Sequence, residues 1–103
     1  MSNYRCITLL CCSMLIMLSG YVHSADVTKG SKIYSRHCSH CHGQDGLSVM
    51  PNAPDLSQPR GIIRSDIRLK ERLENGKRGC PSFKGVISER DILNLIAYVR
   101  TLY

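Results

Sequence analysis

Cys38, Cys41 and His42 form a Cys-x-x-Cys-His pattern, the arrangement that attaches a c-type haem. Two thiols on one helical turn can add across the two vinyl groups of a haem and hold it by thioether bonds. The imidazole of His42 then lies under the porphyrin, where it can bind the iron from the proximal side. We therefore expect one covalently bound haem c (iron protoporphyrin) per chain and a function in electron transfer.

Other uses of these thiols fit the sequence less well. A zinc site needs a second ligand pair at a defined spacing, and the later chain offers only Cys80 and no further histidine. A thioredoxin-like thiol pair needs a βαβ context, for which the chain shows no pattern.

Residues 1–24 have the pattern of a signal peptide. Arg5 gives a positive start, residues 7–18 form an apolar run, Gly20 interrupts it, and Ser24 precedes the expected cleavage site. The apolar run is short for a membrane span. We predict export to the periplasm, with an uncleaved membrane anchor as the alternative, and a cytochrome-like domain over residues 25–103.

The remaining 79 residues, 25–103, make one small domain near the size at which an apolar core alone is marginal. A haem would add a large apolar body, so the apoprotein should be poorly folded. Without Arg5 the formal charge of +6 falls to about +5. This balance favours redox protein partners with acidic docking surfaces. Nothing in the pattern indicates nucleic-acid binding.

Helical patterns account for most of the domain, and no segment predicts a strand. Residues 26–37 predict a first helix with Val27, Gly30, Ile33 and Tyr34 facing inward. Glycines and prolines predict a loop over residues 43–60. Ser65 and Gly76 would begin and end a second helix, whose buried residues would be Ile67, Leu69 and Leu73. Ser88 would cap the last helix, whose inward positions are Ile92, Leu95, Ile96 and Val99. The expected fold class is all-α.

The chain resembles a small class I cytochrome c of the bacterial periplasmic monohaem type, from about residue 26 to residue 102. Gly30 and Tyr34 stand eight and four residues before Cys38, where this family has a glycine and an aromatic residue. The resemblance implies three to four short helices around one haem, with the first and last helices crossing closely at Gly30. Leu95 and Tyr98 would be the partners at that crossing.

The same resemblance implies a hydrogen bond to the axial histidine, and it shows one position at which this chain differs from the family. Pro54 lies twelve residues after His42, where the family's proline carbonyl accepts a hydrogen bond from the axial histidine. The family's distal ligand is a methionine followed by proline, and here Cys80 stands in that place before Pro81. Cys80 is our candidate distal iron ligand, because iron accepts soft thiolates. The alternatives are a labile thiol that leaves the iron open, a bridge to a partner, and ligation by Met50.

Two functions follow from these alternatives. A six-coordinate iron suits a one-electron carrier between periplasmic or membrane redox partners, and a thiolate would lower its potential. A labile Cys80 would instead suit a haem-thiolate subunit or sensor acting on sulfur compounds or small haem ligands. We expect a carrier rather than an enzyme, since no catalytic acid–base group stands beside Cys80.

Two further expectations concern the surface. His40 should face solvent. A stripe of arginines should form a solvated face or a docking surface, namely Arg60, Arg64, Arg68 and Arg72.

Overall fold

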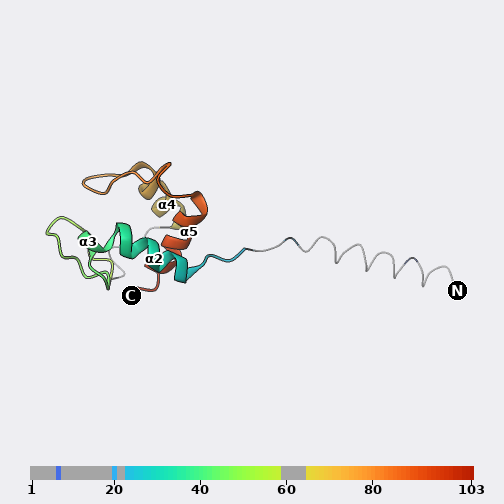
Figure 1. Cartoon of the computed structure of the whole chain (residues 1–103), viewed down its shortest axis with the longest axis horizontal. Helices are drawn as coiled ribbons and strands as arrows, with labels where there is room; N and C mark the ends of the chain where they lie inside the picture. Colours follow the sequence, from blue (N-terminus) through green and yellow to red (C-terminus); the bar gives the residue numbers. More distant parts are fainter. Residues whose placement is uncertain (1–6, 8–19, 21–22, 59–64) are drawn as a thin grey trace.

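The computed structural model describes Ile7, Gly20 and residues 23–58 and 65–103. Four helices follow one another in these ranges: α2 (Val27–His37), α3 (Ser39–His42), α4 (Asp66–Asn75) and α5 (Glu89–Val99). The described residues form no strand, only isolated bridges at Lys77–Cys80 and Lys84–Ile87. The all-α prediction is confirmed. α2 lies across α5, and the loop between α3 and α4 extends to one side (Figure 1).

Short-range capping sets the helix boundaries. The side chains of Asp26, Ser65 and Ser88 each accept a hydrogen bond from the backbone N–H three residues further on, at 2.9, 3.4 and 3.1 Å. Each bond satisfies a donor that the first helical turn leaves free. Gly76 ends α4 with a positive φ of 67°. The predicted starts at Ser65 and Ser88 and the end at Gly76 are confirmed.

Gly30 allows α2 and α5 to cross at close range. A Cβ atom at this position would lie 2.0 Å from the backbone oxygen of Asn94 and 2.9 Å from the Cβ of Tyr98. Both contacts are shorter than packed atoms tolerate, so only glycine fits. Tyr98 is the expected partner, whereas Asn94 was not predicted. The buried Asn94 side chain also accepts a 2.8 Å hydrogen bond from the backbone N–H of Asp26.

The core forms where these two helices meet. Ile33, Tyr34 and Leu95 are buried together, and the Tyr34 and Tyr98 rings lie 5.2 Å apart. Several partly buried side chains surround them: Cys38, Leu56, Leu73, Ile87, Val99 and Leu102.

Two residues predicted to face inward are exposed instead. Val27 is 42% exposed because it lies in the first turn of α2, before the crossing at Gly30. Ile67 is 71% exposed, while Leu69 and Leu73 are partly buried. Two residues turn a helix by about 200°, so Ile67 cannot share the face of Leu69. The burial prediction was wrong at these two positions.

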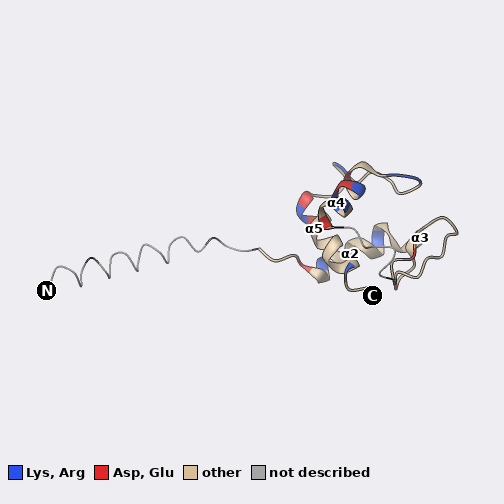
Figure 2. Cartoon of the chain, turned by 180° about the vertical axis from the view of Figure 1, so that it is seen from behind, with Lys and Arg blue, Asp and Glu red and all other residues tan. Residues whose placement is uncertain are grey.

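Ion pairs join α5 to both α2 and α4, where acidic and basic residues meet in Figure 2. They are Lys29–Asp91 at 2.8 Å, Lys70–Glu89 at 3.0 Å and Arg100–Asp66 at 2.8 Å. Partly exposed pairs contribute little free energy in water. They therefore orient α5, while apolar packing at the crossing supplies most of its stabilisation.

Candidate functional site

The Cys-x-x-Cys-His segment forms one helical turn that continues from α2 into α3. The backbone N–H of Cys38 donates to the Tyr34 carbonyl at 2.8 Å, and those of Cys41 and His42 donate to the Cys38 carbonyl at 3.2 and 2.9 Å. Cys38 and Cys41 are both free and partly buried. The turn therefore offers two neighbouring thiols, with the imidazole directly after them.

A single hydrogen bond fixes the His42 ring. Its Nδ1 lies 2.9 Å from the carbonyl oxygen of Pro54. A carbonyl only accepts, so Nδ1 carries the proton and Nε2 keeps its lone pair for a metal ion. The hydrogen bond between His42 and the Pro54 carbonyl, which the family resemblance implied, is therefore present.

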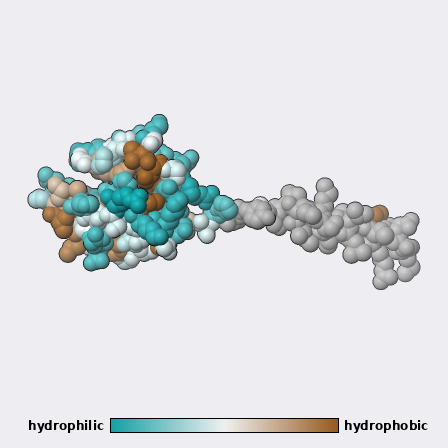
Figure 3. Space-filling model, viewed as in Figure 1, coloured by the Kyte–Doolittle hydropathy of each residue, from teal (hydrophilic) through white to brown (hydrophobic). Residues whose placement is uncertain are grey.

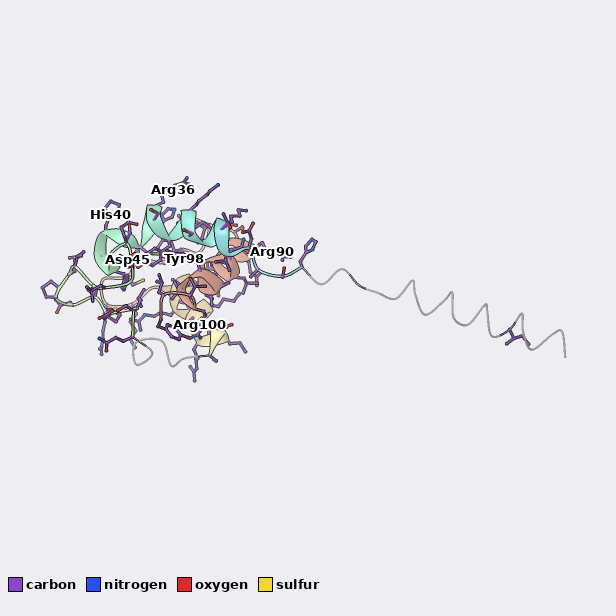
Figure 4. The ribbon with its side chains drawn as sticks, turned by 90° about the horizontal axis from the view of Figure 1, so that it is seen from below. Arg36, His40, Asp45, Arg90, Tyr98 and Arg100 are labelled. Carbon is purple, nitrogen blue, oxygen red and sulfur yellow. The ribbon has the colours of Figure 1, made fainter. Side chains whose placement is uncertain are left out.

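Tyr34 ties the start of the next loop to the core. Its hydroxyl donates a buried 2.7 Å hydrogen bond to the Gly43 carbonyl. Burial raises the pKa of Tyr34 to about 12, so the group stays a neutral donor. Further along, the N–H of Leu56 donates to the Gly46 carbonyl at 2.8 Å. These contacts hold the loop that presents Pro54, and the Tyr98 side chain of α5 lies on the side of α2, where its ring meets that of Tyr34 (Figure 4).

The Cys80 thiol shares its surroundings with the two thiols of the motif. Burial, with smaller contributions from Cys80 and Cys41, raises the pKa of Cys38 to about 12. The pKa of Cys80 is also raised, mainly by burial, with Cys41 adding to the rise and the positive charge of Arg72 opposing it. Because such electrostatic effects fall off with distance, the three thiols belong to one part of the domain.

This set of donors fits a haem better than a bare metal ion. Two thiols are available for thioether bonds, one imidazole nitrogen is free, and Cys80 offers a soft ligand from a separate loop. Among the residues that the structure describes, no three His, Cys, Asp or Glu groups converge tightly enough to hold a metal ion. A haem held between two axial ligands separates their donor atoms, so those atoms are not expected to lie within bonding distance of one common metal ion when the haem is absent.

The structure separates Met50 from Cys80. Met50 is 49% exposed on the loop between α3 and α4, outside the buried core. His40 is exposed, as predicted, and projects from α3 on the same side as Arg36 (Figure 4). The His37 ring meets Phe83 edge-on at 5.7 Å, a contact that the sequence did not reveal.

The arginine stripe does not form one uniform face. Arg60 and Arg64 lie outside the described residues. Arg68 is exposed and lies 3.7 Å from Glu71. Arg72 is partly buried, and its positive charge opposes the rise in the pKa of Cys80. Spacing alone could not separate the two.

Comparisons with known proteins agree with this geometry. The family described as "Cytochrome C oxidase, cbb3-type, subunit III" matches residues 25–99. Cytochrome c6 of Synechococcus sp. is 34% identical over 85 residues, covering 80% of this chain and 75% of the relative. Cytochrome c6 of Gracilaria tenuistipitata var. liui is 31% identical over 80 residues, covering 74% and 72%. The solved structure of cytochrome c6 from the diatom Phaeodactylum tricornutum aligns with a TM-score of 0.65 at 24% identity. That alignment covers 77% of this chain and all of the other, and it supports the same fold.

Proposed function

This chain belongs to the class I cytochrome c family and is a monohaem electron carrier, and we propose that its iron is held between His42 and Cys80. Its single, covalently bound haem c supplies a one-electron couple. Cys38 and Cys41 form the thioether bonds, and His42 is the proximal ligand. The observation that carries the proposal is the place of Cys80 in the chain, directly before Pro81, where the family has its methionine ligand, and the electrostatic effects between Cys80 and the motif thiols support it.

The surrounding residues suit these roles. The Pro54 carbonyl orients the His42 ring and raises its basicity as a ligand. Burial raises the pKa of Cys80, and the positive charge of Arg72 opposes that rise and so favours the thiolate that would bind iron. A thiolate donates more charge than a thioether and favours the oxidised iron. We therefore propose a carrier of lower potential than one with a His/Met pair.

A Cys80→Ala variant tests the ligand assignment. The purified ferric wild type should show a low-spin spectrum with thiolate character, by absorption and electron paramagnetic resonance. Cys80→Ala should lose that signature and bind added imidazole. A variant that keeps the wild-type spectrum would contradict the assignment. Wild type that already binds imidazole tightly would favour the sensor alternative.

We place the docking surface for redox partners in a groove between α2 and the turn before α5. The groove has a volume of about 400 Å³, and its charged wall carries Lys29, Lys32 and Arg36 along one side of α2. Lys29 is paired with Asp91 at 2.8 Å. Lys32 and Arg36 have no ion-pair partner among the described residues. Two positive charges therefore remain for an acidic segment of a partner protein.

The floor of this groove is apolar and lies next to the attachment site. Ile33, Val86 and Ile87 line it, and Val86 is 63% exposed. Figure 3 shows an apolar patch on the side where the chain runs before α5, with hydrophilic surface around it. His37 also lines the groove and directly precedes Cys38. A partner seated here would lie beside the thioether at Cys38.

Export through residues 1–24 remains our proposal for location. Most of that segment lies outside the described residues. Within the described part of the chain, no helix has the length and apolar character needed to cross a membrane. Intact-mass measurement of the protein from a host that matures cytochromes c tests the cleavage site. A chain starting at Ala25 is expected, and retention of residues 1–24 would favour the membrane anchor.

A further inference from the structure

We infer that Gly76 is a positioning residue, which lets the Cys80 loop lie against the end of α4 and so fixes the sulfur. The inference rests on the proposed ligation by Cys80. It concerns residues 76–83, where three contacts fasten the loop on both sides of the thiol.

Gly76 is packed against backbone atoms of the ligand loop. A Cβ atom there would lie 2.7 Å from the Ser82 nitrogen, 2.8 Å from the Cys80 oxygen and 2.9 Å from the Pro81 carbonyl carbon. None of these atoms belongs to a flexible side chain that could swing away. Any side chain at this position must push the Cys80 segment outward.

The chain immediately before Cys80 forms a tight turn. Lys77 and Cys80 exchange two backbone hydrogen bonds, at 3.0 and 3.2 Å. The two residues between them both have positive φ, 49° at Arg78 and 88° at Gly79. This is the pattern of a type I′ turn. An arginine rarely adopts a positive φ, so the neighbouring contacts must hold the turn in place.

The chain after Cys80 is fastened to α4 as well. The N–H of Phe83 donates to the Leu73 carbonyl at 2.9 Å, and the Ser82 hydroxyl donates to the Glu74 carbonyl. The Phe83 side chain is only 4% exposed. Only Pro81 lies between the turn that ends at Cys80 and the fastened residues Ser82 and Phe83, and the proline ring restricts φ at its own position. The loop therefore holds its shape through contacts within the protein.

Gly79 provides a matched control for Gly76. Both residues have positive φ, 67° at Gly76 and 88° at Gly79, so alanine pays a conformational cost at either one. A Cβ on Gly79, however, meets no atom within 4 Å. The two alanine variants differ in the collision with the Cys80 backbone and in the backbone cost at Gly76, whose φ of 67° and ψ of 164° are essentially restricted to glycine.

The experiment compares ferric spectra and imidazole affinity of four holoproteins: wild type, Gly76→Ala, Gly79→Ala and Cys80→Ala. Gly76→Ala should lose the low-spin thiolate signature and bind imidazole roughly tenfold more tightly than wild type. Gly79→Ala should behave like wild type. A Gly76→Ala protein with the wild-type spectrum and affinity overturns the inference, as does an equal loss in Gly79→Ala.

Cys80→Ala distinguishes this inference from the function on which it rests. If Cys80→Ala keeps the wild-type spectrum, the proposed ligand is wrong. If it changes while Gly76→Ala does not, only the positioning role is wrong. Should Gly76→Ala yield no holoprotein, Ser82→Ala removes one fastening bond without a collision. It should raise imidazole affinity measurably, and an unchanged affinity would overturn the inference.

Discussion

Burial separates the two sulfur atoms that could complete the iron site. Met50 lies half exposed on the loop that carries Pro54, on the His42 side. Cys80 is partly buried and contributes to the raised pKa of Cys38, and Cys41 contributes to the raised pKa of Cys80. A ligand opposite His42 must come from another segment, and Cys80 lies on one, between α4 and α5.

Tyr34 gives a prediction at the scale of one residue. Tyr34→Phe removes the hydroxyl that donates to the buried Gly43 carbonyl. An acceptor left without a partner costs about 1–3 kcal/mol, and we expect a loss of that size in the free energy of unfolding. Denaturant titration of the ferric holoprotein measures it. An unchanged midpoint would mean that water replaces the hydroxyl without cost.

At the scale of helices, the crossing at Gly30 gives the clearest prediction. Gly30→Val would place side-chain atoms where the Asn94 backbone and the Tyr98 Cβ already lie. We expect the free energy of unfolding to fall by at least about 2 kcal/mol. Thr28→Val, at an exposed position of the same helix, is the matched control. Equal stability of the two variants would contradict close crossing.

The Lys29–Asp91 pair predicts a pH dependence for the contact between α2 and α5. The hydrogen bond from Lys29 is the largest of the effects that hold the pKa of Asp91 below its ordinary value of 3.8. A lowered pKa means that this stabilisation is complete above the unfolded pKa and is lost as pH falls through the folded one. Asp91→Asn should therefore unfold at a lower temperature than wild type at pH 7. The difference should disappear in strong acid, and a difference independent of pH would contradict the pairing.

Local sequence patterns predicted the helices well, but they did not predict contacts between residues that are far apart in the sequence. Capping residues and glycines act within a few positions, so the starts at Ser65 and Ser88 could be read directly. The contact of His37 with Phe83 joins residues far apart in the chain, and only the fold brings them together. The roles of Asn94 and Arg72 depend on the same long-range geometry.

The candidate site was predictable for a different reason. Covalent attachment requires its groups on one helical turn, so Cys38, Cys41 and His42 form a contiguous motif. Pro54 came only through the family resemblance, whereas Cys80 also stood out as the cysteine of residues 25–103 that the haem motif leaves unpaired. The type I′ turn and the close packing at Gly76 were missed, since Arg78 is not a residue that predicts positive φ.

At the scale of the whole molecule, the excess positive charge should steer anionic reagents toward the groove beside α2. The oxidation rate of the ferrous protein by hexacyanoferrate(III), a trianion, is a direct probe. Lys32→Glu combined with Arg36→Glu should slow it on the order of tenfold at low salt. The rates should converge at high salt, because mobile ions screen the field.

The control for the slower oxidation is a variant with the same change in net charge at a surface outside the groove. Arg68→Glu combined with Arg90→Glu alters two exposed residues that do not line the groove. It should slow the reaction much less than the groove variant. Equal slowing would show that net charge, rather than this surface, directs the reagent.

Ligation by the Cys80 thiolate is tested most directly by the reduction potential of Cys80→Met. A neutral thioether stabilises ferric iron less than an anionic thiolate, so the potential of the variant should rise above that of wild type. Potentiometric titration of both holoproteins at the same pH and ionic strength measures the difference. A clearly higher potential, with a low-spin spectrum in both proteins, is the predicted result. Indistinguishable potentials would show that Cys80 is not bound to the iron.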